Sequence, residues 1–532
     1  MSIATITPKT GEVSQHGLEW VEETFGLEPR WAVEPQIEHI KQTVQSFRPS
    51  STIEVTFLAQ GAFNKLYDVK IDDETFIIRI SLPVDPSHKV ASEVATIDWI
   101  RLTTSLPVPR VITYQSSPDN LIEFEWILMT KVPGKLLADV WKSLSIHFDV
   151  KARLVKELAT NMACLFRNQL QGIGNIHRKS SALEQSQSAE QTSPTESLDP
   201  AKTARLAESA SSLDPVSNDS SGSSYDVGRI VSMQFFWGSH IHQNVFRGPF
   251  QSSQDWLLAR LALNENDCQS ILERNSAKDT EDLDSDDENE VEDARSALKR
   301  IERLKSILPL FFPTTSDSGF SEPSVMEPSV LSHDDLSRHN ILVDESGNLT
   351  AVIDWECVSA LPLWKSCDYP QFLKGRPRRS EPDRSRYYSG GPDDHTNGDP
   401  PRLYLEDLWE YQATLLRDVF IEEMKLLDAE WVTVFNESVG KRDFEFVVHN
   451  CDDEWKTGHI DSWLDDIAHG GLEGLLGLQD RIEQEQLRLL NLWERRVSLD
   501  WLSEIPRQFF DESKTLEPPN LSLFRQKPCC CC

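Results

Sequence analysis

One stretch of the sequence, residues 331–356, strongly limits what the chain can fold into, because it combines spaced polar residues with an apolar strand pattern. It reads LSHDDLSRHNILVDESGNLTAVIDWE, with Asp335 and Asn340 five positions apart. A turn pattern separates the run 340–344 from a second apolar run that ends at Asp354, so we expect a β-hairpin here. Such a hairpin would bring Asn340 and Asp354 side by side as two oxygen ligands for one metal ion.

Each polar residue of this stretch also has an ordinary structural explanation. Asp335 could cap a helix and Asp354 could be a turn residue at a strand end, but their joint spacing favours a chemical role. His333 is better explained as a structural residue that bonds to the loop backbone than as a proton shuttle. For Glu356 two interpretations stay open, a turn residue or a metal ligand.

The chain length indicates how many packed units to expect. The net charge argues against one class of partner. The chain has 532 residues, more than one typical hydrophobic core, so we expect two to three packed units. It carries 86 acidic and 53 basic residues, with a formal net charge of -33. Because nucleic-acid binding needs a basic face, we expect no nucleic-acid partner. No pattern in the sequence sets the oligomeric state.

The cysteines and the hydropathy pattern bear on the cellular compartment. Four of the nine cysteines form the run at 529–532, and the other five show neither CxxC pairing nor zinc-type spacing. We find no signal peptide and no apolar run of about 18 residues, so we expect no transmembrane segment. An intracellular, cytoplasmic location is therefore expected. The terminal cysteines could be lipidated, but a frayed tail is the simpler interpretation.

Residues 51–132 show an order of elements that is typical of a small mixed lobe. β-branched and aromatic runs alternate with short turn signals, and one longer segment has helical periodicity. The expected elements are strands at 52–60, 64–71 and 75–81, a helix at 89–104, and strands at 107–114 and 121–132.

The remaining segments differ from this lobe in composition. Residues 1–50 are expected to form an amphipathic lead-in, 133–510 a mostly helical region, and 511–532 a flexible tail. Polar, charged and Pro/Gly-rich insertions interrupt the helical region, and such composition cannot bury enough apolar surface to offset the entropy of ordering. We therefore expect disorder at 178–224, 276–295 and 376–401.

The pattern His333-x-Asp335-x4-Asn340, followed by Ile-Asp-Trp-Glu, resembles the aminoglycoside phosphotransferase family, and in particular its fungal-type members. The resemblance covers about residues 50 to 375 and is weak over the C-terminal helices. It implies a two-lobed, protein-kinase-like α+β fold. The expected N-terminal lobe is a small antiparallel sheet with one helix, and the C-terminal lobe is mostly helical. It also implies ATP and magnesium as cofactors and a small-molecule hydroxyl compound as acceptor.

The resemblance assigns a role to each residue that matches the family pattern. Asp335 would be the catalytic base, and Asn340 and Asp354 would hold magnesium. Arg79 falls where the family usually has a phosphate-pairing Lys. Glu93, fourteen residues later, would hold that cation in place.

Two further stretches resemble the parts of the family's nucleotide site that act through backbone groups. The run 59–69, AQGAFNKLYDV, resembles the phosphate-covering loop, in which Gly61 permits a close approach of the backbone. The strand 126–134 resembles the hinge, where backbone groups near Met129 and Lys131 would meet adenine.

Two departures from the family pattern leave a second interpretation open. The usual His-Gly-Asp reads His333-Asp334-Asp335 here, and Arg79 stands in place of Lys. The alternative to an ATP- and magnesium-dependent phosphotransferase is therefore a catalytically silent, kinase-like binding or scaffold module. The presence of Asp335 together with both expected metal ligands favours the enzyme.

Overall fold

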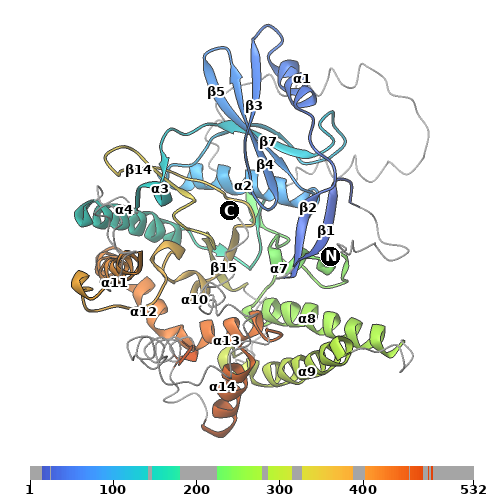
Figure 1. Cartoon of the computed structure of the whole chain (residues 1–532), viewed down its shortest axis with the longest axis vertical. Coiled ribbons are helices and arrows are strands. Elements are labelled where there is room, and N and C mark those ends of the chain that lie inside the picture. Colours follow the sequence, from blue (N-terminus) through green and yellow to red (C-terminus); the bar gives the residue numbers. More distant parts are fainter. Residues whose placement is uncertain are drawn as a thin grey trace, which may run out of the picture. The chain divides into compact units, whose positions relative to one another are not determined.

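The computed structural model describes residues 15–23, 26–141, 147–179, 224–277, 285–313, 326–387, 402–453, 456–470, 477–478 and 481–482. The chain forms two compact units, each assembled from segments that are distant in sequence. The first unit comprises 1–134, 173–242 and 350–360, and the second comprises 135–172, 243–349 and 361–532. The first contains an antiparallel sheet and the second is mostly helical, which confirms the expected α+β class (Figure 1).

The first unit is built on a five-stranded antiparallel sheet of order β3-β4-β5-β7-β6. Its strands are β3 (Ile53–Gln60), β4 (Asn64–Ile71), β5 (Glu74–Ser81), β6 (Val111–Gln115) and β7 (Glu125–Thr130). Helix α2 (His88–Thr103) joins β5 to β6 and packs on one face of the sheet (Figure 1). This order of strands and helix is the one that the sequence predicts.

The alternation of side chains along β5 places one charged residue on the helix side of the sheet. Ile78 and Ile80 are fully buried in the hydrophobic cluster on one face. Ile77 packs with Val90 of α2 on the other face. Because successive side chains of a strand point to opposite faces, Arg79 shares the face of Ile77 and points toward α2.

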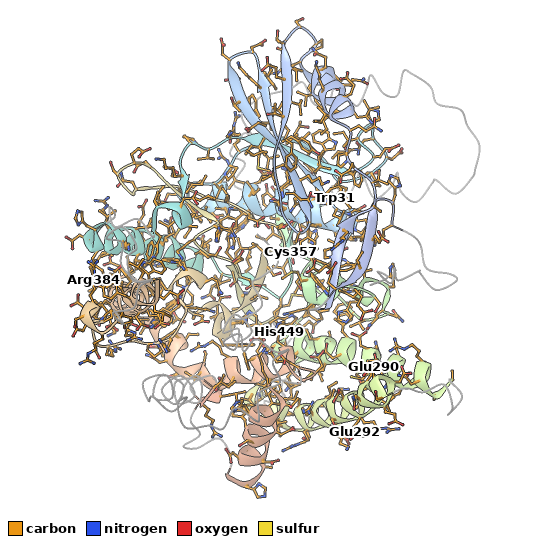
Figure 2. All side chains as sticks on the ribbon, in the orientation of Figure 1. Trp31, Glu290, Glu292, Cys357, Arg384 and His449 are labelled. Carbon is orange, nitrogen blue, oxygen red and sulfur yellow. The ribbon has the colours of Figure 1, made fainter. Side chains whose placement is uncertain are left out.

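The expected lead-in of residues 1–50 contains regular structure from Leu18 onward. Strands β1 (Leu18–Glu23) and β2 (Gly26–Trp31) form a hairpin, and helix α1 (Ile37–Phe47) follows. The hairpin is held by aromatic contacts, since Trp20 lies 5.1 Å from Trp237 and Trp31 lies 5.1 Å from Phe124 between ring centroids. Figure 2 shows Trp31 on β2. These rings supply the apolar burial that makes the hairpin stable.

Short elements complete the first unit. Strands β10 (Ile176–Arg178) and β11 (Tyr225–Val227) pair with each other, and α7 (Met233–Phe236) and the 3-10 turn η1 (His240–His242) follow. Most of the expected insertion 178–224 lies outside the described residues. Phe63, from the loop between β3 and β4, is fully buried against Phe236 in an aromatic core.

The second unit consists of helices with a few short strands. The helices are α3 (Leu137–Trp141), α4 (Phe148–Arg167), α8 (Ser253–Ser276), α9 (Ser285–Phe311), α10 (Leu363–Ser366), α11 (Arg402–Leu427), α12 (Ala429–Glu437), α13 (Val439–His449) and α14 (Thr457–Gly470). The strands are β8 (Lys135–Leu136), β9 (Leu170–Gln171), β12 (Pro328–Ser332) and β13 (Ile341–Val343). No helix in the described part of the chain is long and apolar enough to cross a membrane.

The expected disorder over 276–295 is wrong for its second half, because α9 begins at Ser285. Acidic residues in the first turn of α9 interact favourably with the positive end of the helix dipole. Glu290, labelled in Figure 2, forms an ion pair of 2.6 Å with Arg274 of α8. Ala294 is buried in the same hydrophobic cluster as Cys268 of α8. The acidic residues at 286–293 therefore lie at exposed or half-buried positions of a helix that packs against α8. The linker 278–284 and the tail 511–532 lie outside the described residues.

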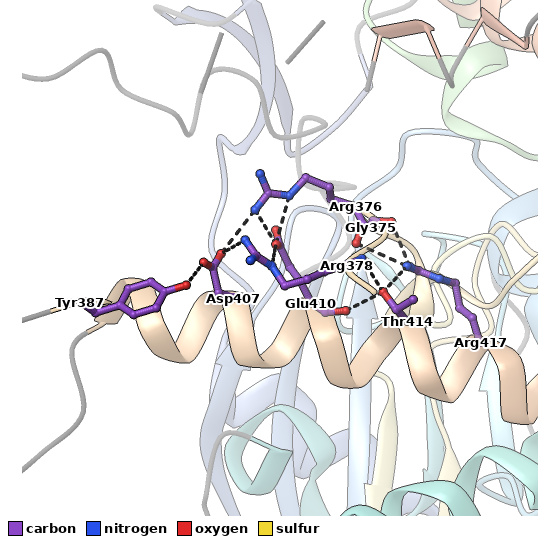
Figure 3. Close-up of polar contacts among 8 residues, drawn as sticks. All are labelled: Gly375, Arg376, Arg378, Tyr387, Asp407, Glu410, Thr414 and Arg417. Carbon is purple, nitrogen blue, oxygen red and sulfur yellow. Dashed lines mark hydrogen bonds and ion pairs between the residues drawn. The ribbon is translucent and has the colours of Figure 1, made fainter. Parts of the chain in front are cut away.

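The segment after Gly375, expected to be disordered over 376–401, is held on helix α11 as far as it is described (Figure 3). Arg376 and Arg378 form ion pairs with Glu410, at 2.6 Å and 3.4 Å. Arg417 donates to the backbone oxygen of Gly375 at 2.9 Å. Polar composition predicted disorder here, but the arginines find carboxylates on one face of a helix. Residues 388–401 lie outside the described part.

Candidate active site

Asp335 and Asn340 lie in the second unit, on the loop that joins β12 to β13. The Nδ2 atom of Asn340 donates to Oδ2 of Asp335 at 2.9 Å and to the Asp335 backbone oxygen at 2.9 Å. Burial raises the pKa of the Asp335 carboxyl, while hydrogen bonds from Ser337 and Asn340 oppose this rise. Because the amide nitrogen of Asn340 is used in this way, its oxygen is the atom that can coordinate a metal ion.

The backbone of this loop is fixed by neighbours within the second unit. The backbone N–H of Phe372 donates to the oxygen of Leu336 at 3.1 Å, and that of Ala138 donates to the oxygen of Arg338 at 2.9 Å. The Leu336 side chain is buried in the core. Asp335 is thus presented from a loop whose next residues are held by two backbone hydrogen bonds.

The unusual Asp334 lies beside a buried ion cluster of the second unit. Glu445 of α13 accepts from Arg260 of α8 at 2.5 Å and from Lys365 of α10 at 2.7 Å. The Asp334 side chain is exposed, yet the surrounding protein raises the pKa of its carboxyl, with Lys365 opposing the rise. The substitution of Gly by Asp therefore places a carboxylate next to cations that can balance its charge.

Glu445→Gln is expected to destabilise the second unit by about 3–5 kcal/mol, because Arg260 and Lys365 would lose their shared carboxylate. Burial opposes ionisation of Glu445, but Lys365 and Arg260 outweigh it and hold the carboxyl pKa well below its ordinary value. The contribution of these ion pairs to the free energy of unfolding is therefore fully present above the ordinary Glu pKa. It is lost as the pH falls toward the lowered pKa that Glu445 has in the folded protein. Urea unfolding of wild type and variant at neutral and acidic pH measures both effects, and equal stabilities at neutral pH would contradict the assignment.

Arg79 is the centre of a second buried cluster, which lies wholly in the first unit. Its NH1 atom donates to Oε1 of Glu93 at 2.9 Å, and its NH2 atom donates to Oδ1 of Asp354 at 2.9 Å. NH2 also lies 2.6 Å from Oε2 of Glu356. The predicted pair of Arg79 and Glu93 is therefore present, and the guanidinium bridges from helix α2 to the segment that carries the expected metal ligand.

The carboxylates and cations of the Arg79 cluster change one another's pKa. Burial opposes the charge of Arg79, but Glu356, Glu93 and Asp354 outweigh burial and raise the pKa of the guanidinium. Burial raises the pKa of Asp354, and the positive charge of Arg79 opposes this rise. The negative charge of the nearby Glu356 raises the pKa further. Arg79 and Lys89 together hold the pKa of Glu356 below its ordinary value, against the effect of burial.

Among the three carboxylates around Arg79, Asp354 is the one that a ligand can reach. Its side chain is 16% exposed, compared with 1% for Glu93 and 3% for Glu356. Its backbone has a φ of 64°, a left-handed conformation that costs most residues about 1–2 kcal/mol and that Asp tolerates better than most. Trp355, which follows, is buried and donates to the Val352 oxygen at 3.0 Å. Such strain is typical of functional sites.

The turn that the sequence predicts between the two apolar runs is present. Strands β13 and β14 (Leu349–Val352) flank it, and Asp344 donates its backbone N–H to the oxygen of Asn348 at 3.0 Å. Asn340 belongs to the second unit and Asp354 to the first. Their joint binding of one metal ion stays a prediction.

Comparison with known proteins gives these two clusters a family context. Residues 54–364, more than half of the chain, match the phosphotransferase enzyme family, APH. The chain belongs to this family. This membership confirms the resemblance seen in the sequence motifs.

Several relatives in this phosphotransferase family are fungal. A subtelomeric hrmA-associated cluster protein of Aspergillus fumigatus is 25% identical over 353 residues, which cover 60% of this chain and 60% of that protein. The altered inheritance of mitochondria protein 9, mitochondrial, of Lachancea thermotolerans is 25% identical over 356 residues. That match covers 62% of this chain and 52% of the relative, so the chain spans only part of the length of both relatives.

Among solved structures, the chain is similar to aminoglycoside phosphotransferases at low identity and low TM-score. A thermostable mutant of aminoglycoside phosphotransferase APH(4)-Ia is 13% identical, with 81% of this chain and 100% of that chain covered and a TM-score of 0.35. Spectinomycin phosphotransferase APH(9)-Ia, in complex with ADP and spectinomycin, is 10% identical, with 82% and 98% covered and a TM-score of 0.28.

The remaining predicted site residues of this APH-family chain lie on the sheet of the first unit. Gly61 donates its backbone N–H to the oxygen of Asn64 at 2.9 Å, which closes the loop between β3 and β4. Met129 is buried in β7, in register with Ile77 of β5. Lys131 follows β7, and its side chain pairs with Asp68 at 2.7 Å. The predicted contacts of these backbone groups with nucleotide stay predictions.

The sequence motifs did not identify two polar residues of the Arg79 cluster. Lys89 of α2 lies 2.5 Å from Glu356, and Asn64 donates its Nδ2 to the same carboxylate at 2.8 Å. Lys89 stands four residues before Glu93, on the same face of the helix. That spacing, in a helix whose other residues are mostly apolar, is the one signal that could have marked it.

Proposed function

We propose that the protein is an ATP- and magnesium-dependent phosphotransferase that moves the γ-phosphate of ATP to a hydroxyl of a small molecule. The observation that carries the proposal is the buried bridge formed by Arg79, which donates to Glu93 and to Asp354. A cation for the phosphates, held by a helix carboxylate next to a metal-binding carboxylate, is what phosphoryl transfer needs. A solvated arginine would need no such pair of buried partners.

The donor set of the chain suits magnesium. Asp354 offers a partly exposed carboxylate, and Asn340 offers an amide oxygen, both of which are hard ligands of the kind that Mg²⁺ prefers. In this proposal Asp354 and Asn340 hold the ion. When bound, the ion neutralises charge on the β- and γ-phosphates.

Asp335 would orient the acceptor hydroxyl and take its proton. The acceptor oxygen forms a bond to the γ-phosphorus, the bond from that phosphorus to the bridging oxygen breaks, and ADP leaves. The hydrogen bond from Asn340 fixes the Asp335 carboxylate in one orientation. Arg79 would steady the phosphates, with Gly61 in the covering loop and backbone groups near Met129 and Lys131 at the adenine.

The acceptor and the location of the protein belong to the proposal as well. Solved structures of APH(4)-Ia include complexes with hygromycin B, and we propose a small hydroxyl compound as the acceptor here. A neutral or cationic acceptor suits a chain with a net charge of -33. We propose an intracellular location, either the expected cytoplasm or the mitochondrion. The name of the relative from Lachancea thermotolerans includes the word mitochondrial.

Release of ADP tests the proposal directly. The full chain is incubated with ATP and MgCl2 and with a panel of amino sugars, amino alcohols and sugars, and ADP formation is followed with and without each acceptor. An acceptor-dependent rate that disappears with EDTA supports phosphotransfer. Binding of ATP without ADP release for any acceptor would favour the silent, kinase-like binding module.

Arg79→Ala is expected to lower kcat/KM for ATP by about 100-fold, because a phosphate-contacting donor is removed. Arg79→Lys keeps the charge but cannot donate to Glu93 and Asp354 with two separate nitrogens, so a smaller loss is expected. Steady-state kinetics with the best acceptor measures both variants. A wild-type rate for Arg79→Ala would rule out the phosphate role.

A further inference from the structure

Lys89 is a fully buried lysine whose charge has no part in the roles described so far. Its Nζ lies 2.5 Å from Oε2 of Glu356, 3.0 Å from Oδ1 of Asn64 and 3.3 Å from Oγ of Ser81. An ammonium group has three donors, and these three contacts use all of them. With its side chain only 1% exposed, Lys89 cannot reach a phosphate directly.

Glu356 joins three separate parts of the first unit through a single oxygen. Its Oε2 receives the contact from Lys89 of α2, lies 2.6 Å from NH2 of Arg79 on β5, and accepts from Nδ2 of Asn64 at 2.8 Å. Asn64 begins β4 and closes the loop of Gly61. The carboxylate thus connects the phosphate-pairing cation with the proposed phosphate-covering loop.

The distances indicate which carboxylate sets the position of the guanidinium. Arg79 is nearer to Glu356, at 2.6 Å, than to Glu93 or Asp354, both at 2.9 Å. A buried ion pair adds little stability compared with apolar residues of similar size, so stability alone is a poor explanation for it. Positioning of a neighbouring functional group is the better explanation.

We propose, on the basis of the proposed function, that Glu356 is a positioning residue that fixes Arg79 and the Gly61 loop relative to each other. Lys89 is its buried counter-ion. This assignment resolves the two interpretations of Glu356: it is neither a simple turn residue nor a metal ligand. It also gives Asn64 a role as the link between loop and carboxylate.

Three variants of the full chain test the proposal: Glu356→Gln, Lys89→Met and the double variant. Matched variants of an exposed ion pair serve as controls. Each is measured for melting temperature, for the Kd of Mg-ATP by calorimetry, and for KM and kcat. Glu356→Gln leaves the buried Lys89 ammonium without its carboxylate partner, and Lys89→Met leaves Arg79 alone among three carboxylates. A fall in melting temperature of about 5 °C or more is therefore expected for each of these two variants. Glu356→Gln is also expected to raise the Kd and KM for ATP about tenfold or more, because Arg79 loses its nearest anchor.

The double variant separates positioning from stability. Removing both charges should return the melting temperature most of the way to wild type, while the Kd and KM for ATP stay raised. Recovery of stability and ATP affinity together would show that the pair is only structural and would overturn the proposal. Wild-type ATP affinity in Glu356→Gln alone would also overturn it.

The control is the exposed pair of Lys179 and Asp226, which lies in the same unit with its charges 3.1 Å apart. Lys179→Met and Asp226→Asn, alone and together, should leave every measured value unchanged. If the wild type itself binds no Mg-ATP, both the proposed function and this inference fail. If it binds and only the Glu356 and Lys89 variants lack the expected effects, this inference fails alone.

Discussion

Asp335→Asn is expected to lower kcat by about 10²- to 10⁴-fold, while ATP binding and the melting temperature change little. Asn retains an oxygen that can accept the hydrogen bond from Asn340, so the loop should keep its conformation. It lacks the basicity to take the proton of the acceptor hydroxyl. The anchors at Leu336 and Arg338 hold the backbone through contacts that the substitution does not touch.

Single-turnover kinetics with saturating Mg-ATP and acceptor measures this effect apart from product release. Asp334→Asn is the matched control. It removes the same charge one position earlier in the chain, and Asp334 is exposed. The control should stay within a few-fold of wild type. If Asp335→Asn and Asp334→Asn lose activity equally, the assignment of Asp335 as the base is wrong.

Asp354→Ala is expected to weaken Mg-dependent ATP binding by about 100-fold, equivalent to about 2.7 kcal/mol. The variant removes the exposed carboxylate of the Arg79 cluster and one of the partners of the guanidinium. It also forces Ala into a left-handed backbone conformation with a φ of 64°, so some loss of stability should accompany the loss of binding.

Asp354→Asn separates these two effects, because Asn adopts the left-handed conformation readily and can still accept from Arg79. Its melting temperature should match that of wild type. Its ATP affinity should no longer respond to added magnesium, since a weaker oxygen ligand replaces the carboxylate. Calorimetric titration of ATP with and without MgCl2 gives the comparison. Retention of the full magnesium response in Asp354→Asn would contradict the metal assignment.

Local patterns were sufficient to predict the sheet of the first unit, and the family resemblance supplied the pairing of Arg79 with Glu93. The alternation of β5 determines which side chains face α2, and that alternation is visible in sequence. The helix was harder to interpret, because α2 is buried almost all round and its polar residues resemble surface positions. Lys89 was missed for that reason.

The proposed role of Glu356 could not be predicted because its partners are remote in sequence. Asn64 and Glu356 are 292 positions apart, and no periodicity connects them. The helix α9 was missed for a related reason, since its acidic first turns are stabilised by Arg274 on another helix. Composition describes what a segment can bury by itself, and it does not describe what a neighbouring element can contribute.

The position of Lys89 and Glu93 one turn apart on a single helix has a consequence for the thermodynamics of nucleotide binding. Both side chains lie on the same helix, and both are held by ion pairs within the first unit. An incoming phosphate would therefore meet a guanidinium whose rotamers are restricted beforehand. Little conformational entropy remains to be lost at Arg79 on association, so more of the interaction energy can appear as affinity.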